Sequence, residues 1–149
     1  MSLIRLKIVT PEKLVLEQEA YSVTLPVIGG EVTILPDHIP YIGSLAPGEI
    51  FIRREIEGEP EALATSGGFV EFHGNTLTLL ADTAEAAEEI DIDRAEEGRK
   101  RAEELMRERG SIDEEEYARV AASLEKQLIR LKVARKHRSR GGFTLPEEE

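Results

Sequence analysis

The sequence of 149 residues contains no cysteine and no tryptophan, and only 5% of its residues are aromatic. Without cysteine the chain has no disulfide, no thiolate metal site and no cysteine nucleophile. Its three histidines are scattered, at positions 38, 73 and 137, so a histidine metal cage is not expected. With so few aromatic side chains to bury, the chain is predicted to have a folded but thin core.

Basic charge is also scarce, because 30 acidic residues face 19 lysines and arginines and the formal net charge is -11. A general nucleic-acid binder needs a basic field, so nucleic acid is not an expected partner. No apolar run approaches the ~18 residues of a membrane-spanning helix. The first residues lack the apolar core of a signal peptide, and we therefore expect a soluble, cytoplasmic chain.

Residues 1–84 show the two-residue hydrophobic period of strands. Ile4, Leu6 and Ile8 alternate with Arg5 and Lys7, the pattern of a half-buried strand. Further short strands are expected at 14–16, 21–25, 31–35, 50–52, 62–64, 69–72 and 76–80, between turns rich in glycine, proline and asparagine. Strands at this spacing predict a β-sandwich or a flattened barrel.

Residues 85–138 are rich in Ala, Glu, Arg, Lys and Leu, and predict an antiparallel two-helix hairpin. Asp91 is the expected N-cap of the first helix, and Gly110 its left-handed C-cap. A narrow stripe of residues three or four apart follows one face of this helix: Ala95, Gly98, Ala102 and Leu105. The second helix is expected to begin at a capping box, which either Ser111 with Glu114 or Asp113 with Glu116 could form.

The second helix is predicted to combine an apolar face with a basic end. The apolar face consists of Tyr117, Val120, Ala121, Leu124, Leu128 and Leu131. Residues 126–140 hold seven basic side chains and no acid: Lys126, Arg130, Lys132, Arg135, Lys136, Arg138 and Arg140. This run either complements the helix dipole in water or docks on an acidic partner. Residues 139–149 are expected to form a disordered acidic tail.

The sequence has no Ser-His-Asp order, no phosphate-binding glycine loop and no dinucleotide fingerprint. His38 lies between Pro36 and Pro40, in a stiff loop that suits recognition better than a flexible linker. Gly67 and Gly68 precede an apolar strand and predict a bulge or a tight strand entry.

Four segments taken together resemble the epsilon subunit of F-type ATP synthase, and their order and spacing agree with that family over residues 3–137. They are Gly30-Glu31-Val32-Thr33-Ile34-Leu35-Pro36-Asp37-His38-Ile39-Pro40, Leu45-Ala46-Pro47-Gly48, Ser66-Gly67-Gly68-Phe69-Val70-Glu71 and Leu80-Ala81-Asp82. The sequence departs from the family at Asp37, where glycine is more usual, and in the additional residues after His137.

The resemblance implies a flattened ten-stranded β-sandwich at 1–84, followed by the helical hairpin. It also implies a non-catalytic rotor subunit in the central stalk, with gamma, the c-ring and the alpha/beta hexamer as partners. Such a subunit reaches the cytoplasmic face of the bacterial plasma membrane only through the complex, and requires no metal or cofactor. Glu31, Pro36, His38 and Pro40 are expected to face gamma or the c-ring.

The resemblance further implies a regulatory role for the hairpin. In the family, extended helices bring basic residues to the acidic catalytic subunits and brake ATP hydrolysis; here these residues would be Lys126, Arg130, Lys132, Arg135 and Lys136. Some bacterial members bind ATP with an Ile-Asp-x-x-Arg-Ala signature, which Ile90, Asp91, Arg94 and Ala95 match.

The companion residues of that ATP site map onto Glu85, Arg101, Lys126 and Arg130. ATP-binding members carry arginine at the last two positions, and lysine lacks the two-pronged fork of a guanidinium. The alternative is that Asp91 only caps a helix and Arg94 pairs with an exposed acid.

Two functions of other classes also fit parts of the sequence. One is a stand-alone ligand-binding β-sandwich with a helical dimerisation hairpin. The other is an enzyme that uses His38 with nearby acids, which is disfavoured because that loop offers neither an activated nucleophile nor an oxyanion hole.

Overall fold

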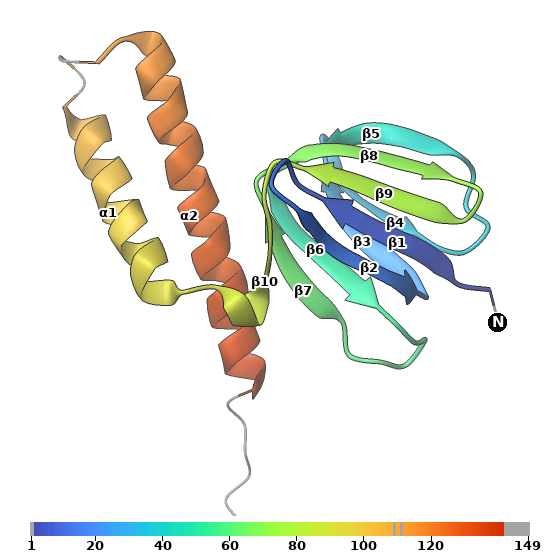
Figure 1. Ribbon diagram of the computed structural model, residues 1–149. Coiled ribbons are helices and arrows are strands. Elements are labelled where there is room, and N and C mark those ends of the chain that lie inside the picture. The colour runs from blue at the N-terminus through green and yellow to red at the C-terminus, as the bar shows by residue number, and fades with distance from the viewer. Residues whose placement is uncertain (1, 109, 111, 142–149) are drawn as a thin grey trace, which may run out of the picture. The chain divides into compact units, whose positions relative to one another are not determined.

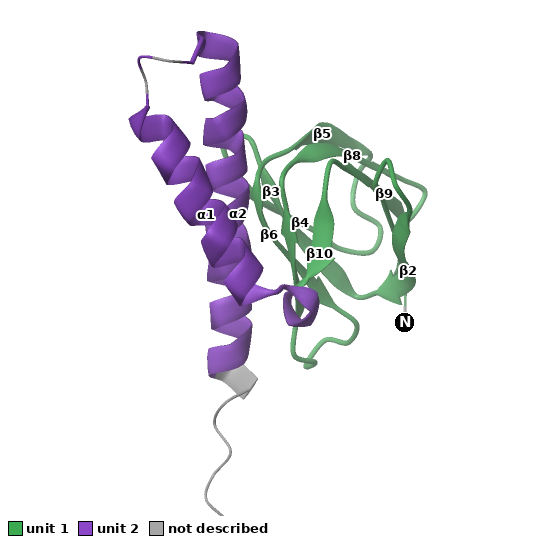
Figure 2. Cartoon of the chain, turned by 60° about the vertical axis from the view of Figure 1, so that its left-hand side comes forward, with its two compact units in different colours: residues 1–86 green, residues 87–149 purple. Residues whose placement is uncertain are grey.

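The computed structural model describes residues 2–108, 110 and 112–141. The chain forms two compact units, Met1–Ala86 and Ala87–Glu149, which Figure 2 shows in different colours. The first unit consists of strands and the second of helices. The boundary follows β10, because this short strand pairs with β7 and so belongs to the first unit.

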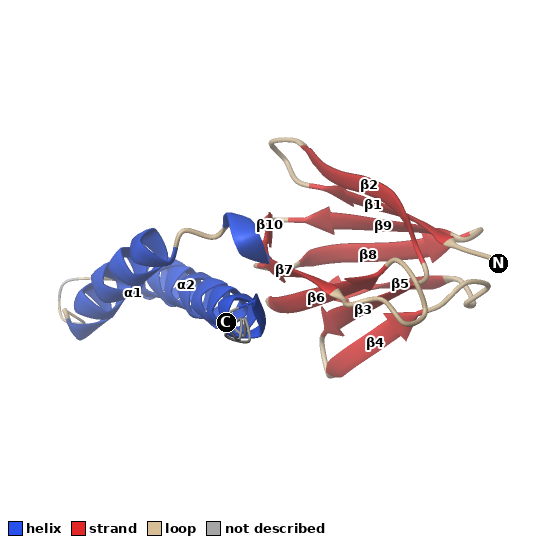
Figure 3. Ribbon diagram, turned by 90° about the horizontal axis from the view of Figure 1, so that it is seen from below, coloured by secondary structure: helices blue, strands red, loops and turns tan. Residues whose placement is uncertain are grey.

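The first unit is a ten-stranded sheet (Figure 1). The strands are β1 (Ile4–Val9), β2 (Leu14–Ala20), β3 (Ser22–Val27), β4 (Gly30–Ile34), β5 (Tyr41–Leu45), β6 (Gly48–Arg53), β7 (Glu61–Thr65), β8 (Gly68–His73), β9 (Thr76–Ala81) and β10 (Ala84–Ala86). They pair in the order β10-β7-β6-β3-β5-β8-β9-β1-β2, and β4 pairs with β3. In Figure 3 the sandwich is seen with β2 at the top of the view and β4 at the bottom.

The sheet folds over a core supplied by both of its halves, which is the predicted β-sandwich. The halves β2-β1-β9-β8-β5 and β4-β3-β6-β7-β10 meet where Val27 of β3 pairs with Leu45 of β5. Ile4, Leu6 and Ile8 are completely buried, so the two-residue period of β1 is confirmed. Phe72 is the largest fully buried side chain; with so few aromatics, aliphatic residues fill the rest of the core.

Two turns of the sandwich depend on residues that tolerate positive φ. Gly74 and Asn75 link β8 to β9 with φ of 57° at both positions, as the two-residue turns of hairpins require. Gly68 begins β8 with φ of 143°, and a Cβ atom there would lie 2.1 Å from the carbonyl oxygen of Leu80. The glycine pair is therefore the expected tight strand entry, because any side chain at Gly68 would displace β9.

The second unit consists of a 3-10 turn η1 (Ala87–Glu89) and the helices α1 (Ile92–Arg107) and α2 (Glu114–Gly141). Asp91 is the N-cap of α1, as predicted, and its side chain accepts a hydrogen bond from the backbone amide of Arg94. Asp113 accepts at 2.7 Å from the amide of Glu116, which confirms the second of the two proposed caps for α2.

The predicted end of α1 was wrong. The helix ends at Arg107, and its C-cap is Glu108, with φ of -84°. The amide of Glu108 donates to the carbonyl of Leu105 at 3.3 Å, so the last turn tightens before Gly110 is reached. Residues 109 and 111 lie outside the described residues, as does the expected tail from 142 onward, whereas α2 continues to Gly141.

Small side chains bring α1 and α2 close together. Ala95 and Ala102 are buried, and a Cβ atom at Gly98 would approach the side chain of Gln127 to 2.9 Å. The predicted stripe on α1 is therefore confirmed at its three small residues, whereas its fourth member, Leu105, is 39% exposed. The apolar face of α2 is only partly buried: Leu131 is buried, whereas Leu128 is 48% exposed.

Candidate functional site

The loop between β4 and β5 carries three of the residues expected at an interface. His38 is half-buried between Pro36 and Pro40. Its ring lies edge-on to Phe72 and Tyr41, with centroid distances of 5.9 and 6.4 Å. Its Nδ1 lies 2.7 Å from the carbonyl oxygen of Ile39, to which a protonated Nδ1 donates.

The fourth expected residue, Glu31, lies on β4, where it is exposed and pairs in register with Pro26 of β3. Ile39, in the loop, is 74% exposed. Among the described residues, the contacts of the His38 side chain are with two aromatic rings and a backbone carbonyl. Such an arrangement can present a fixed, partly apolar surface to another protein.

An exposed apolar patch on the sandwich was missed by the sequence reasoning. Phe69 of β8 pairs in register with Leu80 of β9, and Leu80 pairs with Val9 of β1. Ile42 lies two residues before Ser44, the β5 partner of Phe69, and therefore on the same face. Ile42, Phe69 and Leu80 are 81%, 64% and 54% exposed. We call Val9, Ile42, Phe69 and Leu80 the outer apolar patch.

The signal for this patch was present in the sequence. Phe69-Val70 and Leu79-Leu80 place two large apolar residues side by side in a strand, and adjacent strand residues point to opposite faces. Val70 and Leu79 are buried, so Phe69 and Leu80 must point outward. Contiguous exposed apolar surface of this kind marks interaction sites.

The predicted nucleotide signature has a structural role at the start of α1. Oδ1 of Asp91 accepts from the backbone amide of Arg94 at 3.1 Å. Ile90 and Ala95 are 2% and 0% exposed. The acidic member of the signature thus caps the helix, and its two apolar members are buried. The side chain of Arg94 is exposed, so Arg94 is the residue of the signature that remains available to a ligand.

The structure distributes the companion residues over both units. Glu85 lies on β10, in the first unit. Arg101 lies on α1, and Lys126 and Arg130 are half-buried on α2. Arg130 donates to Oε1 of Gln127 at 2.8 Å.

A groove between the helices brings Arg101 together with residues that the sequence reasoning did not select. Its volume is about 260 Å³, and it is lined by Gly98, Arg101, Ala102, Leu105, Glu116, Arg119, Val120, Ser123 and Gln127. Two guanidinium groups, a hydroxyl and an amide are therefore within reach of a ligand there. The signal for Arg119 and Ser123 is helical spacing, since they lie one turn apart on the side of α2 that carries Gln127.

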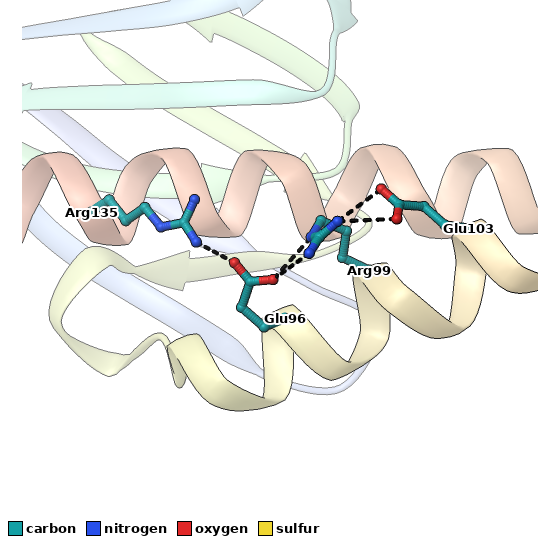
Figure 4. A network of polar contacts seen from close by, with 4 residues as sticks. All are labelled: Glu96, Arg99, Glu103 and Arg135. Atoms are coloured by element: carbon teal, nitrogen blue, oxygen red, sulfur yellow. Dashed lines mark hydrogen bonds and ion pairs between the residues drawn. The ribbon is translucent and has the colours of Figure 1, made fainter.

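An ionic chain joins the two helices, as Figure 4 shows. Arg99 contacts Glu96 at 2.8 Å and Glu103 at 2.9 Å along α1. Glu96 also forms an ion pair with Arg135 of α2. The hydrogen bond from Arg99 holds the pKa of Glu96 below its usual value, against partial burial, and Arg135 adds to this lowering. Both glutamates raise the pKa of Arg99.

The residues expected to form an inhibitory basic face are spread around α2. Lys126 and Arg130 are one turn apart, whereas Arg135 follows Lys126 by nine residues and lies on roughly the opposite side of the helix. Lys132 lies about 60° around the helix from Arg135, whereas Lys136 lies about 100° from Arg135, between Lys132 and Lys126. Arg135 is already engaged by Glu96.

Comparison with known families matches both units. The family domain described as "ATP synthase, Delta/Epsilon chain, beta-sandwich domain" matches residues 3–87. The domain described as "ATP synthase, Delta/Epsilon chain, long alpha-helix domain" matches residues 88–135.

Proteins and structures similar to the chain agree with this match. It is 44% identical over 137 residues to an ATP synthase epsilon chain of Herpetosiphon aurantiacus, covering 92% of this chain and 98% of the relative. It is 43% identical over 141 residues to an ATP synthase epsilon chain of Dehalococcoides mccartyi, covering 93% and 96%. A chain of the Euglena gracilis mitochondrial ATP synthase has the same fold, with a TM-score of 0.74 at 23% identity, covering 90% of this chain and 82% of that one. The chain therefore belongs to the delta/epsilon-chain family of ATP synthase.

Proposed function

We propose that the chain is a non-catalytic rotor subunit of the central stalk of an F-type ATP synthase, where it couples ion flow to ATP synthesis. The observation that carries this proposal is the match of both units, in order, to the two domains of the family. The stand-alone sandwich and the enzyme built on His38 have no comparable support.

The sandwich is the part that binds the rotor. Its proposed contacts are the outer apolar patch and the loop from Pro36 to Pro40, with gamma and the c-ring as partners. An exposed apolar patch that extends across four neighbouring strands costs solvation free energy unless a partner covers it. A sandwich without catalytic side chains suits an element that transmits torque.

The chain meets the membrane through the complex, at its cytoplasmic face in a bacterial cell. Among the described residues, no helix is long and apolar enough to cross a bilayer. The c-ring therefore supplies the membrane contact in this proposal.

The hairpin is the proposed brake on ATP hydrolysis. When closed, it holds Arg135 against Glu96 of its own α1. When open, it frees Arg135, beside Lys132 and Lys136, to meet acidic surfaces of the alpha/beta hexamer. Several close opposite charges together outweigh the screening that weakens a single surface pair. Because few large apolar side chains are buried between the helices, the free-energy gap between the two states is small enough for a ligand to shift.

ATP is the proposed ligand that favours the closed hairpin. Arg94, Arg101, Lys126 and Arg130 supply positive charge for phosphates, and the groove beside Arg101 adds Arg119. ATP bound between the helices would stabilise the closed state by its differential affinity for that state. High ATP would then release the brake, and low ATP would set it.

Capture of gamma by the purified chain tests the proposal. We expect a monomer that forms a stoichiometric complex with gamma in size-exclusion chromatography. Phe69→Ser, in the outer apolar patch, and Glu31→Lys, on β4, should weaken capture because each alters the proposed surface. Glu57→Lys is a matched charge-reversal control at an exposed turn between β6 and β7. A free-standing dimer that ignores gamma would contradict the proposal.

A further inference from the structure

The loop that carries His38 is built around a residue with unusual backbone geometry. Asp37 has φ of 65°, in the left-handed region that non-glycine residues seldom occupy. Asp and Asn enter this region more readily than other residues, because their short polar side chains bond locally. Asp37 therefore needs a partner that offsets its strain.

Asn75 is that partner, although it lies 38 residues away in the turn between β8 and β9. The amide of Asp37 donates to Oδ1 of Asn75 at 2.6 Å, and Nδ2 of Asn75 donates to Oδ1 of Asp37 at 2.9 Å. The backbone amide of Asp37 can only donate, so the oxygen of Asn75 must face it. This fixes the orientation of the side-chain amide.

Asn75 also holds a third segment. Its backbone carbonyl accepts from the amide of Arg5 in β1 at 2.8 Å. The side chain of Asn75 thus binds the loop, and its main chain binds the neighbouring strand. Removing only the side chain separates these two roles.

The remainder of the loop is restrained on both sides of Asp37. The amide of His38 donates to the carbonyl of Leu35 at 3.1 Å, and the His38 ring lies against Phe72. Ile39 nevertheless remains 74% exposed. The backbone that carries this large apolar side chain is therefore restrained while the side chain faces water, which is the arrangement of a preorganised binding anchor.

We propose that Asn75 is a positioning residue for the rotor interface. Through Asp37 it holds the loop from Pro36 to Pro40 in the conformation that presents His38 and Ile39 to gamma or the c-ring. The chain then bears the entropy cost of ordering the loop when it folds, and not when it binds its partner. This inference rests on the proposed function, because it concerns how the same surface recognises the rotor.

Three variants test the positioning role. Asn75→Gly keeps the positive φ and the carbonyl that receives the Arg5 amide, but removes both side-chain hydrogen bonds. Asn75→Asp keeps an acceptor for the Asp37 amide but places two carboxylates against each other. Combining Asn75→Asp with Asp37→Asn restores the pair with donor and acceptor exchanged, because the new amide at position 37 can donate to the new carboxylate.

Two measurements are made on the full chain: amide hydrogen exchange, and affinity for a gamma–c-ring subcomplex. Asn75→Gly should remove protection at Asp37 and leave Arg5 protected. It and Asn75→Asp should bind about tenfold more weakly, the cost of ordering about one loop residue on binding. The double variant should recover both protection and affinity. A loss confined to folding stability would not separate Asp37 from Arg5 in this way.

The His38→Ala variant distinguishes two outcomes: that Asn75 does not position the loop, and that the loop is not part of the rotor interface. If protection at Asp37 is unchanged in Asn75→Gly, the side chain does not hold the loop and the inference is overturned. The inference is also overturned if Asn75→Gly loses protection at Asp37 but keeps its affinity, while His38→Ala weakens binding. If neither Asn75→Gly nor His38→Ala changes affinity, the loop is not part of the interface, and the proposed placement fails with the inference.

Discussion

At the scale of single residues, several side chains in the hairpin have a structural role that overlaps with a proposed regulatory one. Asp91 caps α1 and is also the acid of the nucleotide signature. Glu96 closes the hairpin by holding Arg135, a residue of the proposed brake. Replacing either residue with alanine changes folding and regulation together, so each test needs a variant that separates the two effects.

Calorimetric titration with ATP tests the signature at Asp91 and Arg94. We expect the wild-type chain to bind with micromolar to millimolar affinity, about -8 to -4 kcal/mol. Arg94→Ala should abolish the heat, because it removes the guanidinium while the backbone amide still reaches the cap. Asp91→Ala should lose ATP binding and the N-cap of α1. Loss of the cap should lower the free energy of unfolding by about 1 kcal/mol.

Asp91→Ser separates the two roles of Asp91, because serine is also a good N-cap. If the carboxylate contacts the ligand, this variant folds normally and binds poorly. If the wild type gives no heat at millimolar ATP, or if the Arg94→Ala variant binds equally well, the signature is only a helix start.

Acid titration tests the ionic chain at Glu96. Its pKa is lowered in the folded hairpin, so its contribution to stability is present above the unfolded value of about 4.3 and is lost as the pH falls through the lower folded value. Glu96→Gln should therefore reduce hairpin stability at neutral pH and flatten this acid dependence, measured by far-ultraviolet circular dichroism. Glu97→Gln, which makes the same charge change at the adjacent exposed position, should do neither. Equal pH profiles for the two variants would contradict the role of Glu96.

At the scale of elements, the predictable parts are those in which periodicity or capping acts alone. β1 follows its alternation, and Asp91 and Asp113 begin the helices as predicted. β5 was not predicted because Ile42 and Gly43 break the alternation, and its pairing with β8 depends on a partner distant in sequence. β10 was not predicted because Ala-Glu-Ala favours helix, and pairing with β7 overrides that preference. The outer apolar patch was not predicted either, because it depends on the register of four strands.

The close contact of α1 and α2 gives a prediction at this scale. Gly98→Leu should loosen the hairpin, because a Cβ atom there already approaches the Gln127 side chain to 2.9 Å. Gly98→Ala is the control: the end of the flexible Gln127 side chain can move aside, and alanine favours helix by about 0.8–1.0 kcal/mol over glycine. Thermal unfolding of the helices should therefore shift downward for leucine and not for alanine. A leucine variant as stable as wild type would mean that the helices do not pack through Gly98.

At the scale of the whole molecule, the chain combines two units with different energetics. The sandwich buries a continuous, mainly aliphatic core, whereas the hairpin buries fewer large side chains and depends on a surface ionic chain. Such a division suits a rotor subunit in which one unit stays assembled and the other changes state. The net charge of -11 is compatible with this division, because the basic residues of 126–140 are concentrated on α2.

ATP hydrolysis by the reconstituted complex of the catalytic hexamer, gamma and this chain tests the central claim most directly. Truncation after Gly110 removes all of α2 and leaves the sandwich. The account predicts that the truncated chain still assembles with gamma and that the complex then hydrolyses ATP faster than the complex with the full chain. Replacing Lys132, Arg135 and Lys136 with glutamine in the full chain should have the same direction of effect. Hydrolysis no faster with the truncated chain than with the full chain, in a complex of unchanged composition, would contradict the account.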